Sequence, residues 1–325
     1  MKIYSRRDVL KSSAVVAGVA FASNALNSAG GNRLALASAL PNNPEIAFPS
    51  APRDRLAVAS WPFRGYIESP TNKYRDKKQT GMDLRDFAAQ VRNRFGVPGV
   101  EPLSSHFSST EAKYLESFRA ALDRAGVHVV NIPVDNQHSY YDADSAARKQ
   151  AVENGKKWID VAVIIGSPSV RTSIAEARDA KPDVNLAADE IRRVVDYAAA
   201  KNIIVNLEND NLISENALFV VNVIEKVNHP YLRALPDFCN SMAGGDEKFN
   251  YDAVTRMFQH AYNICHVKDS EVSESGKMVR VDLQRTFGIL KASHYRGYCS
   301  MEWEGGGDPQ EGTHKLIDAS LKNLS

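Results

Sequence analysis

Four acidic or imidazole side chains each follow a short apolar run in the C-terminal half of this 325-residue chain. They are Glu208 after IIVNL, Asp237 after LRALP, His266 after NIC and Glu302 after YCSM. The intervals between them are 29, 29 and 36 residues, which suits successive strand–helix units of about 30 residues or more. Three carboxylates and an imidazole are suitable ligands for a divalent cation. The pattern therefore predicts a metal-dependent enzyme whose site is built by four consecutive strand ends.

The alternation of side chains along a strand adds further polar groups to this site. Residues at i and i+2 share a face, and the pairs concerned are Asn206 with Glu208, His266 with Lys268, and Glu302 with Glu304. In a closed barrel one face lines the lumen, so these groups are expected to converge above the barrel axis. Burying so many charges without a partner is costly. A cation would offset that cost for the carboxylates, and a neutral imidazole nitrogen can ligate it.

Eight apolar runs alternate with amphipathic stretches after residue 55. The expected strands are 56–60, 98–105, 127–135, 161–169, 203–209, 232–238, 263–268 and 298–304. Helices are expected at 82–95, 111–125, 143–160, 187–201, 214–227, 251–260, 282–292 and 311–323. Such alternation predicts an α/β fold with a parallel sheet and right-handed crossovers. Eight units favour closure into a (β/α)8 TIM barrel, with rim loops at 65–81, 241–250 and 270–281. No glycine-rich dinucleotide fingerprint follows the first strand, which argues against an open doubly wound sheet.

The N-terminus predicts export. Arg6 and Arg7 stand ahead of the modest apolar stretch SSAVVAGVAFAS, which looks like a twin-arginine signal. We expect residues 1–39 to be this signal peptide, 40–55 a linker and 56–325 a single barrel domain. The apolar stretch is too short and too rich in small residues for a stable membrane span. The protein is thus expected to use the twin-arginine export machinery and to be periplasmic or secreted.

The bulk composition excludes some functions. Hydrophobic residues make up 43% and charged residues 24% of the chain, as in ordinary globular proteins. The formal net charge of +1 gives no basic excess to attract nucleic acid. The three cysteines, Cys239, Cys265 and Cys299, are too few for a disulfide framework. We expect them to be buried apolar fillers rather than zinc ligands.

The four predicted ligands, together with the run His-Val-Lys-Asp at 266–269, resemble the xylose isomerase-like TIM-barrel family. This family includes sugar isomerases and epimerases similar to D-tagatose 3-epimerase. The run WPFRGY at 61–66 and the strand end GVE at 99–101 are also similar. The resemblance covers residues from about 55 to 323 and rests on the order and spacing of these motifs.

The resemblance implies a function. It implies that Glu208, Asp237, His266 and Glu302 hold one divalent ion, Mn²⁺ foremost, with Mg²⁺, Co²⁺ or Zn²⁺ as alternatives. The two glutamates would also be catalytic. One would remove a proton next to a carbonyl group, and the other would return a proton to the resulting enediolate. The expected reaction is isomerisation or epimerisation of a sugar or polyol-type carbonyl compound. Barrels of this family are often dimers or tetramers, so a homo-oligomer is also implied.

One position departs from the family's epimerases. Asn240 stands three residues after Asp237, where they often have histidine. Asparagine can hydrogen-bond a hydroxyl group but does not readily shuttle a proton. A lyase that eliminates a β-leaving group from a keto-sugar is therefore an alternative, as is a non-catalytic sugar-binding barrel. A phosphodiesterase acting on DNA is opposed by the neutral charge, the export signal and the few histidines.

Five further residues are candidates for contact with the substrate, and a structural role is open for each of them. Glu101 and His106 would meet hydroxyl groups, and Arg171 an anionic or polyol group. Asn240 would hydrogen-bond a hydroxyl group, and Lys268 would hold an oxyanion or pair with Glu302.

Overall fold

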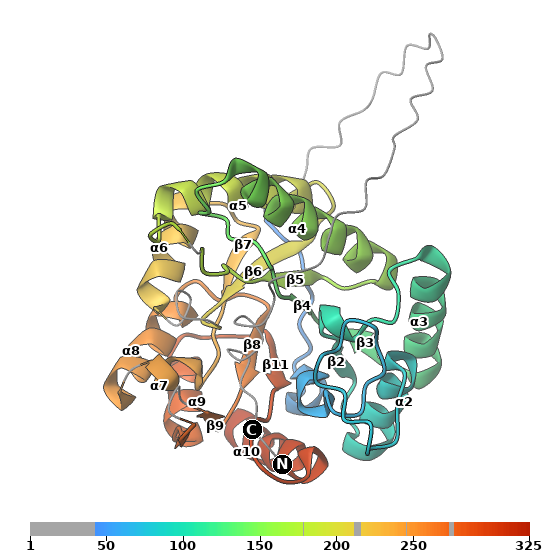
Figure 1. Ribbon diagram of the computed structural model, residues 1–325. Helices are drawn as coiled ribbons and strands as arrows, with labels where there is room; N and C mark the ends of the chain where they lie inside the picture. The colour runs from blue at the N-terminus through green and yellow to red at the C-terminus, as the bar shows by residue number, and fades with distance from the viewer. Residues whose placement is uncertain (1–42, 178, 211–215, 245, 273–275) are drawn as a thin grey trace.

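Parallel strands form a closed barrel at the centre of the molecule, as the ribbon in Figure 1 shows. The computed structural model describes residues 43–177, 179–210, 216–244, 246–272 and 276–325. Its barrel strands are β1 (Leu56–Ala59), β2 (Gly99–Glu101), β3 (His128–Val129), β4 (Ile132–Val134), β5 (Ser169–Thr172), β6 (Ile204–Glu208), β7 (Leu232–Leu235), β8 (Ile264–Val267) and β11 (Tyr298–Met301). They pair in the orders β3-β2-β1-β11-β8 and β4-β5-β6-β7.

Two connections join these sheets into one ring. The chain runs from β3 into β4 after two residues, so the pair acts as a single bent strand. Between β7 and β8, parallel bridges join Ala234 to Ala261 and Asp237 to His266. The predicted TIM barrel is therefore confirmed, with β3 and β4 together as its third strand.

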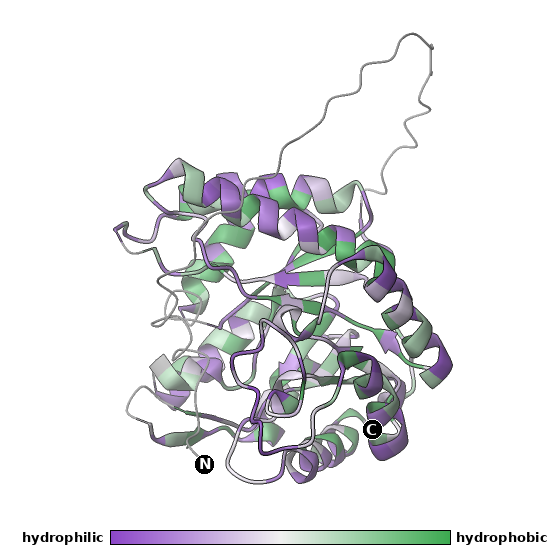
Figure 2. Cartoon of the chain, turned by 45° about the vertical axis from the view of Figure 1, so that its right-hand side comes forward, coloured by the Kyte–Doolittle hydropathy of each residue, from purple (hydrophilic) through white to green (hydrophobic). Residues whose placement is uncertain are grey.

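Helices surround the strands and follow them in sequence. They are α2 (Leu84–Phe95), α3 (Ala112–Ala125), α4 (Ser145–Ile165), α5 (Val184–Ala199), α6 (Ala217–Val227), α8 (Glu247–Phe258), α9 (Leu283–Ala292) and α10 (Pro309–Leu324). Six of them begin at an aspartate whose carboxylate accepts a backbone N–H of the first turn, which stabilises the helix start. Most of their hydrophobic residues are buried, and Figure 2 shows hydrophobic and hydrophilic residues interspersed along the helices. Among the described residues, no helix has both the length and the hydropathy to cross a bilayer.

The predicted fourth strand is wrong in its first half. Residues 161–165 continue helix α4, and β5 starts only at Ser169. Short apolar runs suit a buried helix and a buried strand equally well, so periodicity cannot separate them. The helix ends at Gly166, whose φ of 76° is left-handed and favours glycine. As a result Arg171 lies inside a strand rather than after it.

Two predicted rim loops contain regular structure. Residues 241–250 were expected to be a loop, but α7 (Asn240–Gly244) and the first turn of α8 occupy most of that stretch. Asp237 and Asp246 cap these helices, because their carboxylates accept backbone N–H groups at the helix starts. Within 270–281, strands β9 (Ser270–Val272) and β10 (Met278–Arg280) pair antiparallel.

The N-terminal end of the lumen is closed by an apolar layer, here called the apolar floor. It consists of Ala57, Val130, Leu235, Ile264 and Tyr298, with Phe48 packed against them. Phe48 makes edge-to-face contacts with Tyr262 and Tyr298, at centroid distances of 5.4 and 5.9 Å. Part of the predicted linker thus packs against the barrel, whereas the predicted signal peptide, 1–39, lies outside the described residues.

Alternation along β8 and β11 separates two faces. Cys265 and Cys299 face the surrounding helices and belong to the main hydrophobic core, with their Sγ atoms 3.7 Å apart. Ile264 and Tyr298 face the lumen. His266 and Glu302 follow them on the lumen face at even intervals. The predicted orientation of Cys265 away from His266 is therefore confirmed.

Candidate metal centre

The barrel brings the four predicted ligands together at the C-terminal ends of its strands. Each of Glu208, Asp237, His266 and Glu302, here called the ligand cluster, offers one ligand atom, and these atoms lie within 4.8 Å of one another. All four residues are buried. His266 Nδ1 lies 2.8 Å from Glu208 Oε1 and 3.4 Å from Glu302 Oε2. Strand ends separated by almost a hundred residues thus build one compact site.

Asp237 shows that the cluster suits a cation. Its Oδ1 accepts the backbone N–H groups of Cys239 and Asn240 at 2.8 and 2.7 Å, which fixes the carboxylate. Its Oδ2 is buried and has no hydrogen-bond partner among the described residues. This oxygen lies 3.9 Å from His266 Nδ1, on the side of the other ligand atoms. A buried carboxylate oxygen without a donor is costly, and a metal ion at the cluster would satisfy it.

Negative charge predominates around the cluster. Among the described residues, six buried carboxylates meet two buried permanent cations here, namely Glu101, Glu208, Asp237, Glu271, Glu302 and Glu304 with Arg171 and Lys268. Uncompensated charge in a protein interior is removed by protonation or by binding a counter-ion. The excess of acid therefore favours a divalent cation, and in its absence favours protons.

The pKa values of two ligands reflect that balance. Burial raises the pKa of Asp237 to about 7, against the opposing effect of the Lys268 charge. Burial lowers the pKa of His266, but the charges of Glu101, Glu302 and Glu208 outweigh it and hold this pKa well above its ordinary value. Without a metal ion, a protonated His266 would supply positive charge among these carboxylates. Metal binding must then displace protons.

Arg171, on β5, is fully buried among carboxylates. Its Nε lies 2.8 Å from Glu208 Oε2, so the guanidinium holds one of the predicted ligands directly. Its Nη1 pairs with Asp135 Oδ1 at 2.8 Å and its Nη2 with Asp210 Oδ2 at 3.2 Å. The predicted substrate-binding arginine thus contacts Glu208, a predicted metal ligand.

Lys268 and Asn240 connect the ligand cluster to the rim. Lys268 Nζ lies 3.1 Å from Glu304 Oε2, pairs with Glu271, and lies 4.0 Å from Glu302 Oε2. It also donates to Asn240 Oδ1 at 2.9 Å. The Asn240 side-chain amide donates to Glu208 Oε1 at 3.3 Å. Three acceptors around one ammonium group match its three N–H donors, so Lys268 chiefly orders its neighbours.

The remaining two candidates lie at the end of β2 and in the segment that follows it. The Glu101 carboxylate lies 3.0 Å from His266 Nε2, on the side of the imidazole away from the ligand cluster. His106 lies in the short helix η3 (Ser104–His106), and its Nδ1 forms a hydrogen bond of 2.8 Å with Ser60 Oγ. Both side chains are fully buried. The structure thus brings Glu101 to the ligand cluster, whereas the contact found for His106 is with the end of β1.

Sequence reasoning missed three acidic neighbours in these roles. Asp210 pairs with Arg171, and Glu271 and Glu304 pair with Lys268. Glu304 could have been predicted, because it shares a strand face with Glu302. Glu304 also accepts the indole N–H of Trp61 at 3.0 Å, which brings the WPF turn after β1 to the site.

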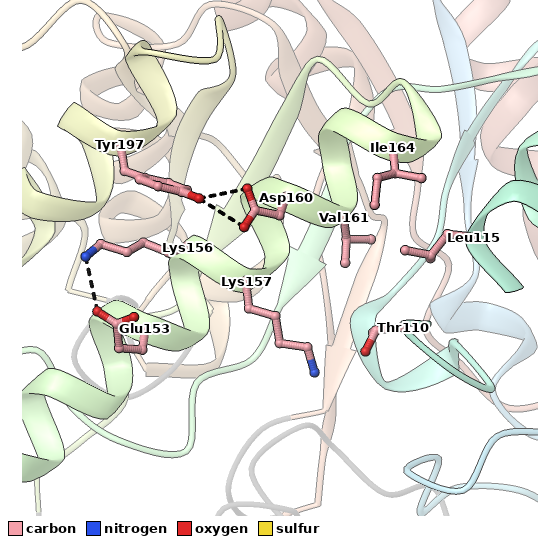
Figure 3. Close-up of a pocket in the computed structure, with 9 residues that line it drawn as sticks. All are labelled: Thr110, Leu115, Glu153, Lys156, Lys157, Asp160, Val161, Ile164 and Tyr197. Carbon is pink, nitrogen blue, oxygen red and sulfur yellow. Dashed lines mark hydrogen bonds and ion pairs between the residues drawn. The ribbon is translucent and has the colours of Figure 1, made fainter. Parts of the chain in front are cut away.

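A separate cavity of about 520 Å³ lies outside the barrel, between α3, α4 and α5 (Figure 3). Leu115, Val161 and Ile164 give it an apolar wall, and Lys156 and Asp160 project at its edge. None of its lining residues belongs to the ligand cluster. This hollow is therefore separate from the ligand cluster at the strand ends.

Comparisons with known proteins agree with the fold. A probable 3-DHS dehydratase of Bacillus anthracis is 15% identical, with a TM-score of 0.59, covering 81% of this chain and 97% of its own. The 3-keto-D-glucoside 4-epimerase of E. coli is 14% identical, with a TM-score of 0.59, covering 82% and 99%. A xylose isomerase-like TIM barrel protein of Mycobacterium smegmatis, solved in complex with magnesium, is 16% identical, with a TM-score of 0.60, covering 83% and 97%.

At these identities the structural likeness shows the fold. A comparison of the sequence with curated proteins found no match. The family model described as xylose isomerase-like TIM barrel matches residues 89–324. This range contains seven of the eight barrel strands and the whole ligand cluster. The chain belongs to the xylose isomerase-like TIM barrel family.

Proposed function

We propose that this protein is a divalent-metal-dependent isomerase or epimerase that acts on a sugar or polyol-type carbonyl compound. The observation that carries the proposal is the ligand cluster, in which three buried carboxylates and one imidazole offer ligand atoms within 4.8 Å of one another. Such a set suits a hard or borderline divalent ion. We propose Mn²⁺ as the ion, with Mg²⁺, Co²⁺ and Zn²⁺ as alternatives.

The protein's own groups divide the work of such a reaction. Glu208, Asp237, His266 and Glu302 would hold the ion. When bound, the ion would supply Lewis-acid stabilisation of negative charge that develops on a substrate oxygen. Glu208 and Glu302 enter from separate strands, so they can remove and return a proton on different sides of a carbon next to the carbonyl group. Asn240 and Lys268 hold these carboxylates in place.

One observation favours a lyase as the second candidate. Glu208 Oε2 is paired with the guanidinium of Arg171 at 2.8 Å. A carboxylate oxygen bound to a guanidinium is less available to accept a proton. Epimerisation needs two groups that move protons, one to remove a proton and one to return it. Elimination of a β-leaving group needs only one base, so it would still be possible if Glu302 alone moved a proton.

The comparisons support a reaction of this class. Among proteins of the same fold are a 3-keto-D-glucoside 4-epimerase and a probable 3-DHS dehydratase. The relative solved with magnesium supports an oxygen-rich divalent site. These relatives also support a small sugar-like substrate.

Metal analysis joined to a keto-sugar screen tests the proposal. Purified protein should contain one divalent ion per chain, lose turnover on chelation and regain it with Mn²⁺. In D₂O an epimerase should give an epimer with deuterium at the exchanged carbon, and a lyase an unsaturated product. Protein that holds no metal and binds sugars equally well with and without chelator would instead be a sugar-binding barrel.

We also propose that residues 1–39 direct the folded protein to the twin-arginine export machinery and so to the periplasm or the cell exterior. Replacing Arg6 and Arg7 with lysine should leave the protein in the cytoplasm. Export that is unaffected by this change would contradict the proposal. Size-exclusion chromatography with light scattering tests the proposed homo-oligomer.

A further inference from the structure

A carboxylate supports the imidazole of the ligand cluster from behind. Both oxygens of Glu101, the last residue of β2, lie 3.0 Å from His266 Nε2. The opposite ring nitrogen, Nδ1, faces Glu208 and Glu302. Glu101 and His266 have no exposed surface, so solvent does not compete for this contact. The ring therefore lies between a carboxylate on one side and the ligand cluster on the other.

The hydrogen-bond partners of Glu101 fix its position. Ser300 Oγ donates to its Oε2 at 2.6 Å, and Asn131 Nδ2 donates to its Oε1 at 2.8 Å. The orientation of the Asn131 amide is set in turn, because its Oδ1 accepts the hydroxyl of Ser169 at 2.6 Å. With the imidazole, three donors surround one carboxylate. Its lone pairs face these donors, and a substrate hydroxyl group is not needed to satisfy them.

We propose that Glu101 is a positioning residue for the metal centre. It holds the proton of His266 on Nε2 and so leaves the lone pair of Nδ1 directed at the ion. This inference rests on the proposed metal site and replaces the predicted contact of Glu101 with a substrate hydroxyl group. A carboxylate that accepts the second N–H of a metal-bound histidine fixes the tautomer and the ring orientation, and its loss lowers metal affinity about 10- to 100-fold.

Replacing the buried Glu101 with glutamine would separate the effect of its charge from the effect of its size. A glutamine at this position keeps the size of the side chain and can still accept one hydrogen bond, but it lacks the charge and can present its NH₂ group to the ring. The imidazole would then turn or change tautomer, and Nδ1 would no longer be held toward the ligand cluster. Metal affinity should fall even where the barrel folds normally.

The test uses Co²⁺ as the probe, with the full mature chain. Titration of Glu101→Gln with Co²⁺ should give an affinity about 10- to 100-fold lower than wild type and an altered visible absorption spectrum. Glu190→Gln is the matched control, since Glu190 is a buried glutamate of α5 that pairs with Arg148 away from the cluster. Unchanged affinity and an unchanged spectrum in Glu101→Gln would overturn the proposal.

A second measurement needs no variant. In ¹⁵N-labelled wild-type protein loaded with Zn²⁺, the histidine ¹⁵N shifts should show His266 protonated at Nε2 and bound through Nδ1. Protonation at Nδ1 would overturn the proposal even if Glu101→Gln failed to fold. Wild-type protein that bound neither Co²⁺ nor Zn²⁺ would refute the proposed function itself, whereas binding that is indifferent to Glu101 would refute only this role.

Discussion

The two ends of the barrel lumen have opposite chemistry, although the same strands build both. On β8, Ile264 belongs to the apolar floor and His266, two residues later, to the ligand cluster. On β11 the sequence on the same face is Tyr298, Ser300 and Glu302. Along a strand, the lumen changes from the apolar floor to buried carboxylates within about 13 Å.

This difference shows how the fold supports a costly site. The floor and the outward face of the strands contribute apolar burial, which stabilises the barrel without charge. The cluster concentrates acid at the other end, where a cation can compensate it. A change at the floor should therefore alter stability and leave metal binding intact, whereas a change at the cluster should alter metal binding or turnover.

The largest effect is expected at Glu302. Replacing it with glutamine keeps the volume and one oxygen ligand but removes the proton acceptor. Turnover of the substrate found in the screen should fall by about 10²- to 10⁴-fold, while the midpoint of thermal unfolding of the metal-loaded protein changes little. Steady-state kinetics at equal metal content measure this. Near-normal turnover in Glu302→Gln would show that this glutamate moves no proton.

The metal-free protein should lose stability as pH rises. The pKa of Asp237 is about 7 in the fold against an ordinary 3.8, so between these values the folded chain retains a proton that the unfolded chain releases. The raised pKa of His266 extends the same trend above its ordinary 6.5. Unfolding free energy should thus decline from about pH 4 upward, and stabilisation by added Mn²⁺ should grow.

Thermal unfolding across a pH series, with and without Mn²⁺, measures this dependence. The Asp237→Asn variant serves as the control, because it lacks the titrating group. Its metal-free stability should decline less steeply with pH than that of wild type. Identical slopes in the two proteins would show that Asp237 does not retain a proton in the fold.

A moderate effect confined to stability is expected at the floor. Phe48→Ala removes two edge-to-face ring contacts and part of the cover over Tyr298. The unfolding free energy should fall by about 2 kcal/mol. Urea unfolding measures the loss, and calorimetry with Mn²⁺ should give an unchanged affinity. A weakened metal affinity would mean that the two ends of the lumen are coupled.

The smallest effect is expected behind the cluster. Cys299 lies on the face opposite Ser300 and Glu302, in the core beside Cys265. Cys299→Ala should cost about 1 kcal/mol of unfolding free energy and leave metal stoichiometry at one ion per chain. Loss of the ion in this variant would show that a thiol is a ligand after all.

Sequence patterns predicted much of this arrangement. The amphipathic period placed α2 within two residues of its observed start, and strand alternation put His266 and Cys265 on opposite faces. The four members of the ligand cluster could be picked out because each follows an apolar run. For these residues, local periodicity and the parallel topology together determine the type of element and the face on which each side chain lies.

Other features depend on contacts that local pattern does not record. Residues 161–165 suit a helix or a strand, and packing against the barrel decides for the helix. The contact of Glu101 with His266 joins residues 165 positions apart. That of Arg171 with Glu208 depends on β5 starting at Ser169. The groups that hold the ligands therefore became apparent only from the assembled barrel.

Anomalous X-ray scattering at the manganese edge, from crystals of the protein grown with Mn²⁺, tests the central claim most directly. The account predicts one peak per chain, within coordination distance of Glu208, Asp237, His266 and Glu302, and its disappearance in Glu208→Ala. No peak at saturating Mn²⁺, or a peak that shares none of these side chains, would contradict it.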